Sequence, residues 1–348
     1  MEACSHTDKN WDFGTQRAAG IDVERLASLK KIIESDYRNI AGIAIAKDGC
    51  LAYEKYFNGS GPEDRHHITS VTKSVVSALV GIAIDEGYIE GVGQRMLDFF
   101  PDLIGTETGE LAEKTTLRHL LTMTAPYAFE DWREPFAELC ASADWERYIL
   151  GSLGRGGPLG RFKYSSMGAH LLSCVITRAT GKSAREFANE RLFAPIGIRE
   201  IPDFAMEGFD FEELFGKGVR GWVSDPKGNS TGGWGLALTP REMARFGALY
   251  IACGSWEGRR VLSEAWIDES TAPSSKVELR GSLLHYGYLW WLSGEGETHA
   301  YMAQGDGGNA ICCIPERRAV VAIAATAAPD APDSLTLIKE QILSALAV

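Results

Sequence analysis

The sequence predicts an α/β fold of the α+β type, in which one antiparallel sheet is built from both chain ends and flanked by helices. Short apolar runs typical of strands occur near the N-terminus and in the last third of the chain, whereas helical patterns fill the middle. We therefore expect one domain over residues 1–348. A sheet-containing subdomain would take residues 15–82 and 240–348, and an inserted, mainly helical subdomain would take residues 83–239.

The first elements are expected to be a helix, a hairpin and a second helix. Residues 21–35 carry apolar side chains at helical spacing. Residues 42–47 and 51–57 flank Asp48-Gly49, a dipeptide typical of a tight hairpin turn. Residues 71–86 are mostly apolar, lack proline and are too long a run for a strand, so we expect a buried helix there.

The remaining elements follow from the same patterns. A capping box with proline at the first helical position, Thr239-Pro240-Arg241-Glu242, should begin a helix that ends near residue 252. Residues 208–235 are rich in glycine and look irregular. Further helices are expected at 117–121, 135–150, 167–180, 183–192 and 330–348, and strands at 284–292, 299–304, 309–314 and 318–326.

Composition and charge exclude several classes of protein. Apolar residues are 45% of the chain, which is typical of a globular protein. The 35 basic and 47 acidic residues give a net charge of −12, which disfavours nucleic acid or an anionic membrane as a partner. The start of the chain has no apolar run typical of a signal peptide, so a cytoplasmic protein is expected. Seven scattered cysteines without a C-x-x-C pair predict reduced thiols rather than a zinc site or disulfide framework.

An S-x-x-K motif at Ser70-Val71-Thr72-Lys73 stands out from two other copies by its surroundings. The copy at Ser224 has proline at its third position, so no helical turn aligns its serine and lysine. The copy at Ser28 lies on the polar side of an amphipathic helix, where its lysine would be solvated and protonated. Ser70, in contrast, begins the most apolar helix of the chain.

The pairing of Ser70 with Lys73 suits nucleophilic catalysis. Positions i and i+3 share a helix face, and Lys73 is the only charge between Ser70 and Asp85. Burial and the positive end of the helix should both lower the pKa of the Lys73 amine, which could then take the Ser70 proton. The free N–H groups of the same helix end suit a developing oxyanion. The alternative is a capping serine with a snorkelling lysine.

Two further segments carry candidate groups. Tyr164-Ser165-Ser166 follows a glycine-rich loop and precedes an apolar helix. There a tyrosine can point into a cleft, and a nearby lysine would lower its phenol pKa enough for acid–base work, although packing is the commoner role. In residues 301–309 a strand ends in glycines and restarts at Asn309, which allows either the close approach of a ligand or a simple hairpin turn.

Together these segments resemble the serine β-lactamase and penicillin-binding-protein superfamily, in its class C β-lactamase-like branch. That branch includes esterases, D-aminopeptidases and aminohexanoate-dimer hydrolases. S-x-x-K, a Tyr-x-Asn-type motif roughly ninety residues later and a Lys-Thr-Gly-type strand near the C-terminus follow the family order. Supporting segments are 118–124, 233–236 and 286–291. The resemblance spans nearly the whole chain and implies a β-lactamase/transpeptidase-like fold.

The resemblance also implies roles for the candidate residues. Ser70 would be the nucleophile, Lys73 its base and Tyr164 the proton donor to the leaving group. The backbone N–H groups of Ser70 and Asp306 would form the oxyanion hole.

Two departures from the family pattern bear on the substrate. Ser166 stands where the family usually has asparagine, so a side-chain amide that orients substrate is missing. Ala303-Gln304-Gly305 stands where lactamases have Lys-Thr-Gly, so the cation that would bind a β-lactam carboxylate is absent there. Both departures favour an esterase or amidase.

Rival candidates are weaker. Gly228-Asn229-Ser230-Thr231-Gly232 matches G-x-S-x-G, but that elbow needs a strand before it and a helix directly after it, and its base would have to be His285 or His299. The helical His119 and His170 are expected to be satisfied structural residues, with no metal. Five tryptophans could line a cleft for an apolar acyl group, although core packing is commoner: Trp132, Trp222, Trp234, Trp290 and Trp291.

We therefore expect acyl transfer to Ser70 followed by hydrolysis of a small ester, amide or lactam, without a cofactor. One alternative is a true β-lactamase or D-alanyl carboxypeptidase. The other is a binding or sensor module of the same fold that does not turn substrate over. The sequence leaves the oligomeric state open.

Overall fold

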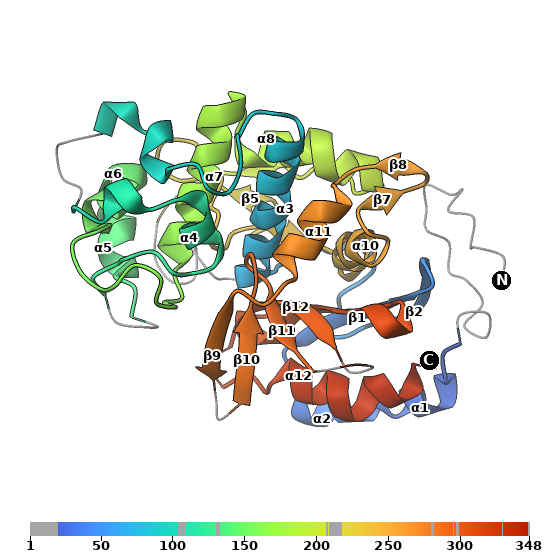
Figure 1. Cartoon of the computed structure of the whole chain (residues 1–348). Helices are drawn as coiled ribbons and strands as arrows, with labels where there is room; N and C mark the ends of the chain where they lie inside the picture. The colour runs from blue at the N-terminus through green and yellow to red at the C-terminus, as the bar shows by residue number, and fades with distance from the viewer. Residues whose placement is uncertain are drawn as a thin grey trace.

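The computed structural model describes residues 20–103, 109–129, 133–206, 208, 218–279, 282–294, 296, 299–328 and 330–346. Its central feature is an eight-stranded antiparallel sheet with the order β2-β1-β14-β13-β12-β11-β10-β9 (Figure 1). The strands are β1 Ile40–Lys47, β2 Cys50–Tyr56, β9 Ser275–Leu279, β10 Ser282–Tyr286, β11 Trp291–Ser293, β12 Ala300–Gly305, β13 Asn309–Ile314 and β14 Ala319–Ala325.

The sheet joins the two ends of the chain, which confirms the predicted architecture. Strand β1 pairs with β14, with Ile43 opposite Ile323 and Ala46 opposite Val320. Every residue of these two strands is buried, so both faces of the sheet are covered there. This explains why their sequences are apolar throughout instead of alternating.

The predicted hairpin at the start of the sheet is also present. Asp48 has φ 53° and Gly49 has φ 79°, and two successive left-handed residues are what a type I′ turn requires. Strand β2 is the edge of the sheet and is only partly buried.

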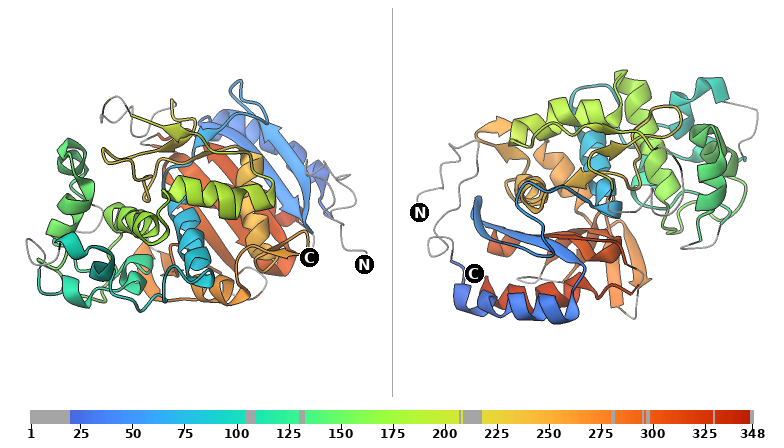
Figure 2. Two further views of the ribbon diagram at one scale, coloured as in Figure 1. Left: turned by 90° about the horizontal axis from the view of Figure 1, so that it is seen from above. Right: turned by 180° about the vertical axis from the view of Figure 1, so that it is seen from behind.

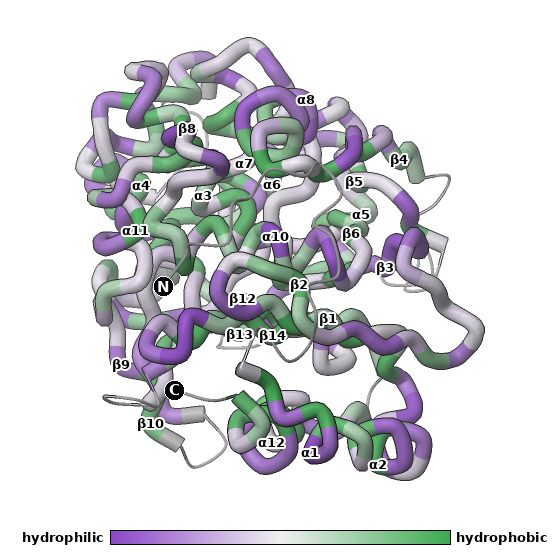
Figure 3. The backbone as a smooth tube through the Cα atoms, turned by 90° about the vertical axis from the view of Figure 1, so that its right-hand side faces the viewer, coloured by the Kyte–Doolittle hydropathy of each residue, from purple (hydrophilic) through white to green (hydrophobic). Residues whose placement is uncertain are grey.

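Helices cover both faces of the sheet (Figures 1 and 2). Helices α1, α2 and α12 lie on one face, and α10 packs against β1, β13 and β14 on the other. Along α1, α2 and α12 polar and apolar residues alternate, as expected of helices that cover a sheet and face water (Figure 3). The helices are α1 Val23–Ala27, α2 Leu29–Asp36, α3 Thr72–Asp85, α4 Leu117–Leu121, α5 Phe136–Ala141, α6 Trp145–Ser152, α7 Ser166–Thr180, α8 Ala184–Ala188, α10 Pro240–Ile251, α11 Glu264–Ser270 and α12 Ser334–Leu337.

The middle of the chain forms a helical region beside the sheet, where α7 packs against α3, α4, α6 and α8 (Figure 2). Helix α3 therefore lies between this region and the sheet. The exact subdomain boundaries stay a prediction. Three short strand pairs complete the fold, namely β3 His66–His67 with β6 Ala237–Leu238, β4 Asp203–Phe204 with β5 Trp222–Val223, and β7 Ser255–Trp256 with β8 Arg259–Arg260.

Some predicted elements are wrong in detail because tertiary contacts interrupt them. The strand expected at 284–292 is a hairpin of β10 and β11, since the chain reverses where Leu289 has φ 62° and donates its N–H to Leu121 of α4. The helix expected at 135–150 is two helices, because Asp144 caps α6 by accepting from Arg147 N. The helix expected at 21–35 is divided at Ser28.

The cysteine prediction needs one correction. Cys50 is disulfide-bonded, whereas reduced thiols were expected throughout. Cys50 begins an edge strand and is partly exposed, so a second thiol can approach it. The free cysteines within the described ranges are Cys140, Cys174, Cys253, Cys312 and Cys313. Across the same ranges, each helix is too short or too polar to cross a membrane.

Candidate active site

Ser70 lies in a strained turn directly before α3. The turn is a 3₁₀ segment, Thr69–Val71, and Thr69 has φ 48°, a conformation that a β-branched residue rarely adopts. Thr72 Oγ1 donates to Thr69 O at 2.7 Å, and Thr69 Oγ1 donates to Asp306 O at 3.3 Å. Ser70 itself is partly exposed. Strain held in place by such bonds is common at functional sites.

Lys73 lies one turn further along and is only 1% exposed. Its Nζ donates to Ser70 Oγ at 2.8 Å and to Gly233 O at 2.7 Å. Burial lowers the pKa of the Lys73 amine to about 8, against the opposing effect of the Glu134 and Asp306 carboxylates. The shift has the direction expected from the sequence, and it makes about a tenth of the amine neutral at pH 7, far more than for an ordinary lysine.

The Gly233 carbonyl, which accepts the second hydrogen bond of Lys73, lies close to α7. A Cβ on Gly233 would lie 2.7 Å from Ser166 Cβ, so a larger residue at position 233 would collide with the first turn of that helix. The contact also brings Ser166, which is buried, against the segment that faces Lys73. The glycine therefore allows the Gly233 carbonyl to reach the amine.

Tyr164 approaches Ser70 from the turn before α7. Its ring centroid is 4.8 Å from Lys73 Nζ, and the nearby Ser70 hydroxyl acts to lower the pKa of its phenol. Trp291 stacks behind the Tyr164 ring, with centroids 5.9 Å apart and planes at 20°. The expected fall in the phenol pKa is wrong: burial raises the pKa of Tyr164, and Asp306 and Glu134 raise it further. A phenol that stays protonated at neutral pH is suited to donate a proton.

The end of β12 lies against the Ser70 turn. A Cβ on Gly305 would lie 2.2 Å from Thr69 Oγ1 and 3.1 Å from Ser70 N, so only glycine fits at this crossing. The exposed Asp306 follows directly. The turn is a hairpin between β12 and β13. The segment that was expected to hold either a ligand or a hairpin therefore has the hairpin, and it also contacts the Ser70 turn.

Two polar side chains border this hairpin. Asn309 holds it in place, because its Nδ2 donates to Asp306 O at 2.8 Å and its Oδ1 accepts from Ala325 N at 2.9 Å. Gln304 differs, since its Nε2 has no hydrogen-bond partner among the described residues. The Gln304 amide is thus a neutral donor that a ligand could satisfy.

Sequence reasoning missed one residue of the site, Glu134. Its carboxylate accepts from Ser165 Oγ at 2.8 Å, from Ser166 N at 2.7 Å and from Met167 N at 2.8 Å. Glu134 lies in a loop before α5, about thirty residues ahead of these partners, and no motif or periodicity marks it in the sequence.

The rival residues serve the fold. Ser230 is buried, and its hydroxyl accepts from Arg185 N at 3.0 Å, in the first turn of α8. The next helix begins only at Pro240, so the G-x-S-x-G match is no nucleophile elbow. His119 completes a capping box with Thr116 at the start of α4.

His170, Cys174 and Asp225 form a buried cluster within the described part of the chain whose spacing would suit a metal ion. Gly232 N donates to His170 Nδ1 at 3.3 Å, which leaves the proton on Nε2, 3.2 Å from Asp225 Oδ2. A metal at Nε2 would need the opposite tautomer. The hydrogen bonds therefore favour a structural network, as expected for His170.

The tryptophans mostly belong to the core. Trp222, Trp234 and Trp290 are almost completely buried, so they do not line a cleft. Trp291 supports Tyr164, as described above, and Trp132 lies outside the described residues.

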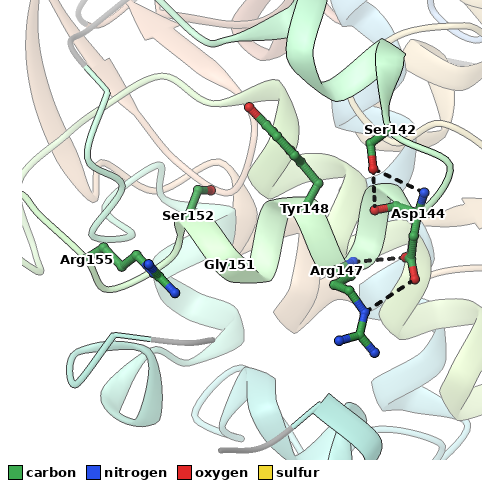
Figure 4. A pocket seen from close by; sticks show the side chains of 7 residues that line it. All are labelled: Ser142, Asp144, Arg147, Tyr148, Gly151, Ser152 and Arg155. Carbon is green, nitrogen blue, oxygen red and sulfur yellow. Dashed lines mark hydrogen bonds and ion pairs between the residues drawn. The ribbon is translucent and has the colours of Figure 1, made fainter. Parts of the chain in front are cut away.

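A surface hollow on the helical region is separate from these groups (Figure 4). It lies along α6 and contains none of Ser70, Lys73 and Tyr164. Its charged residues Arg147 and Asp144 bond to each other. We assign no chemistry to it.

Several known proteins are similar to this chain in sequence or in fold. The family model described as Beta-lactamase matches residues 30–345. The chain is 26% identical over 267 residues to the 6-aminohexanoate-dimer hydrolase of Paenarthrobacter ureafaciens, an alignment that covers 69% of this chain and 61% of that protein. The chain thus spans less than two thirds of that relative's length.

Two solved structures share the fold. The octameric penicillin-binding protein homologue from Pyrococcus abyssi has a TM-score of 0.68 at 21% identity, covering 92% of this chain and 78% of that one. EstCE1, described as a hydrolase with promiscuous acyltransferase activity, has a TM-score of 0.70 at 15% identity, covering 93% and 98%.

Proposed function

The chain belongs to the Beta-lactamase family, and from this premise we propose that it is a serine hydrolase that acts through an acyl-enzyme on a small ester or amide. The observation that carries the proposal is the environment of Ser70 Oγ. It lies 2.8 Å from Lys73 Nζ, which is itself 4.8 Å from the centre of the Tyr164 ring, and it acts on the pKa of the Tyr164 phenol. A nucleophile, a base and an acid are thus within reach of one another.

The acylation step follows from these contacts. Ser70 Oγ attacks the substrate carbonyl carbon, and its proton passes to the neutral Lys73 amine. The N–H groups of Ser70 and Asp306 stabilise the oxyanion of the tetrahedral intermediate. Tyr164 O–H donates a proton to the leaving alcohol or amine as the carbonyl–heteroatom bond breaks. Water then attacks the acyl-enzyme and gives a proton to the Tyr164 phenolate, and Lys73 returns its proton to Ser70 Oγ as the ester bond breaks.

The charges around the site support a substrate without a carboxylate beside the scissile bond. The charged groups that shift the pKa values of Lys73 and Tyr164 are two carboxylates, Glu134 and Asp306. Gln304 offers an N–H donor but no positive charge. A β-lactam or D-alanyl peptide presents an anion, which this arrangement does not favour.

The nucleophile is tested by labelling with a fluorophosphonate followed by peptide mapping. We expect the label on Ser70, and we expect none in Ser70→Ala. The matched control is Ser230→Ala, which should label like the unmodified chain. Label on Ser230 with none on Ser70 would end the proposal. Acylation of Ser70 without release of product would instead favour a non-turnover binding module.

The substrate class is tested by kcat/KM for a nitrophenyl ester against a chromogenic cephalosporin. A charged hydrogen bond to a substrate carboxylate contributes about 1.5–3 kcal/mol, or roughly a factor of 10 to 150. We therefore expect the ester to be preferred at least about tenfold, and Gln304→Lys to narrow the difference. A clear preference for the cephalosporin would contradict the proposed substrate class and favour a true β-lactamase or D-alanyl carboxypeptidase.

A further inference from the structure

Glu134 fastens the turn that carries Tyr164. Its two carboxylate oxygens receive the Ser165 hydroxyl and the N–H groups of Ser166 and Met167, all at 2.7–2.8 Å. Ser165 also caps the helix, because its Oγ accepts from Gly168 N at 2.9 Å. The residue after Tyr164 is therefore bonded both to α7 and to a loop that lies far away in the sequence.

Two opposing effects act on this carboxylate: burial raises the pKa of Glu134 above its ordinary value, whereas its hydrogen bonds and the nearby Lys73 lower it. Helix α7 has 15 residues, and its first free N–H groups point at Glu134. Such N–H groups and the positive end of the helix dipole stabilise a negative charge. The same carboxylate acts electrostatically on Lys73 and on Tyr164. Glu134 is thus linked to both groups that flank Ser70.

We propose that Glu134 is a positioning residue of the acylation step, which holds the Tyr164 turn in register with Ser70 through its three hydrogen bonds and, when ionised, acts as a negative charge on the Lys73 amine. The inference rests on the proposed function.

Two properties of Glu134 can be tested separately, namely its negative charge and the reach of its side chain. The groups that act on Lys73 are Glu134, Asp306, the Tyr164 ring at 4.8 Å and the bonded Ser70 and Gly233. Burial lowers the pKa of Lys73, and the negative charge of Glu134 partly offsets this effect. If that charge is lost, the pKa of Lys73 should fall below its value of about 8. Neutral Lys73 is the base, so kcat/KM rises with pH as Lys73 loses its proton. This rising part of the profile, the acid limb, should move to lower pH.

The test compares Glu134→Gln with Glu134→Asp through the pH dependence of kcat/KM for a nitrophenyl ester. In Glu134→Gln we expect a lower kcat and an acid limb displaced downward by about one pH unit, the lower end of the effect of a nearby opposite charge. In Glu134→Asp, which keeps the charge but shortens the reach, we expect a lower kcat with the limb within about 0.3 unit of its original position.

The control is Glu186→Gln, since Glu186 also caps a helix by accepting from Ser183 N, at 2.9 Å. It should leave both kcat and the limb unchanged. A limb unmoved in Glu134→Gln, in a chain whose Ser70 still labels, would overturn the inference and leave the proposed function intact. Failure of Ser70 to label in the unmodified chain would overturn the proposed function itself. If Glu134→Gln does not fold, native kcat in Glu134→Asp would still overturn the positioning role.

Discussion

Two buried polar clusters border the segment from residue 225 to residue 235, and they differ in the charge of the groups that accept their hydrogen bonds. In the structural cluster, His170 and Asn229 donate to the Asp225 carboxylate, and Gly232 N donates to the other His170 nitrogen. In the proposed catalytic cluster, Lys73 Nζ bonds to the Ser70 hydroxyl and the Gly233 carbonyl, which are neutral groups.

The difference shows how one fold can use buried polar groups for structure and for chemistry. A carboxylate that receives several donors is stabilised in its ionised form, and its hydrogen bonds fix one arrangement. An amine that is buried against neutral acceptors loses hydration without a full compensating charge, so its pKa falls. The first cluster is expected to determine stability, and the second the rate.

The largest expected effect comes from Lys73→Arg. Arginine keeps the positive charge and comparable length but cannot deprotonate, so it cannot accept the Ser70 proton. We expect kcat/KM for a nitrophenyl ester to fall by about 10²-fold or more, the scale of general-base catalysis.

The matched control is Lys47→Arg. Lys47 is also a buried lysine whose Nζ donates to a backbone carbonyl, that of Arg317, at 2.9 Å. This variant should retain near-native turnover. Near-native turnover in Lys73→Arg would show that only the charge at position 73 matters.

A smaller effect is expected from pH alone. The amine acts as base only when neutral, and its pKa is about 8. Its neutral fraction therefore rises as pH increases, by roughly tenfold between pH 7 and pH 9. We expect kcat/KM of the unmodified chain to rise by about that factor over this range. A flat profile across the range would contradict proton transfer to Lys73.

The sequence predicts this site in part because local spacing determines part of its geometry. Ser70 and Lys73 are one helical turn apart, and the apolar surroundings that lower the Lys73 pKa are visible as residues 71–86. Most of the sheet could likewise be predicted, since most of its strands are apolar runs with turn residues between them, whereas the edge strand β9, with polar residues at alternate positions, was missed. The roles of Ser70, Lys73 and Tyr164 remain predictions until they are measured.

What the sequence could not supply depends on contacts between distant segments. Glu134 meets the Tyr164 turn only after the chain has folded. The predicted direction of the Tyr164 pKa shift was wrong because burial raises this pKa and the Asp306 and Glu134 carboxylates raise it further. The chain reverses between β10 and β11, and a hydrogen bond from Leu289 N to α4 holds this reversal in place. The aromatic sequence around the reversal gives no sign of it.

The smallest effect on rate should come from the structural cluster, through His170→Phe. Phenylalanine retains a ring that can pack edge-on against Trp145, as His170 does, but it leaves Gly232 N–H without its acceptor and Asp225 without one of its donors. Each unsatisfied buried group costs about 1–3 kcal/mol, so the free energy of unfolding measured with urea should fall by about that amount or more.

The rate should change less. Because Gly232 precedes the residue whose carbonyl meets Lys73, kcat/KM should fall by less than about tenfold. The acid limb should stay unmoved, since no charge near Lys73 has changed. A displaced acid limb would mean that the two clusters share one electrostatic environment, and an unchanged free energy of unfolding would show that the His170 bonds contribute little to the fold.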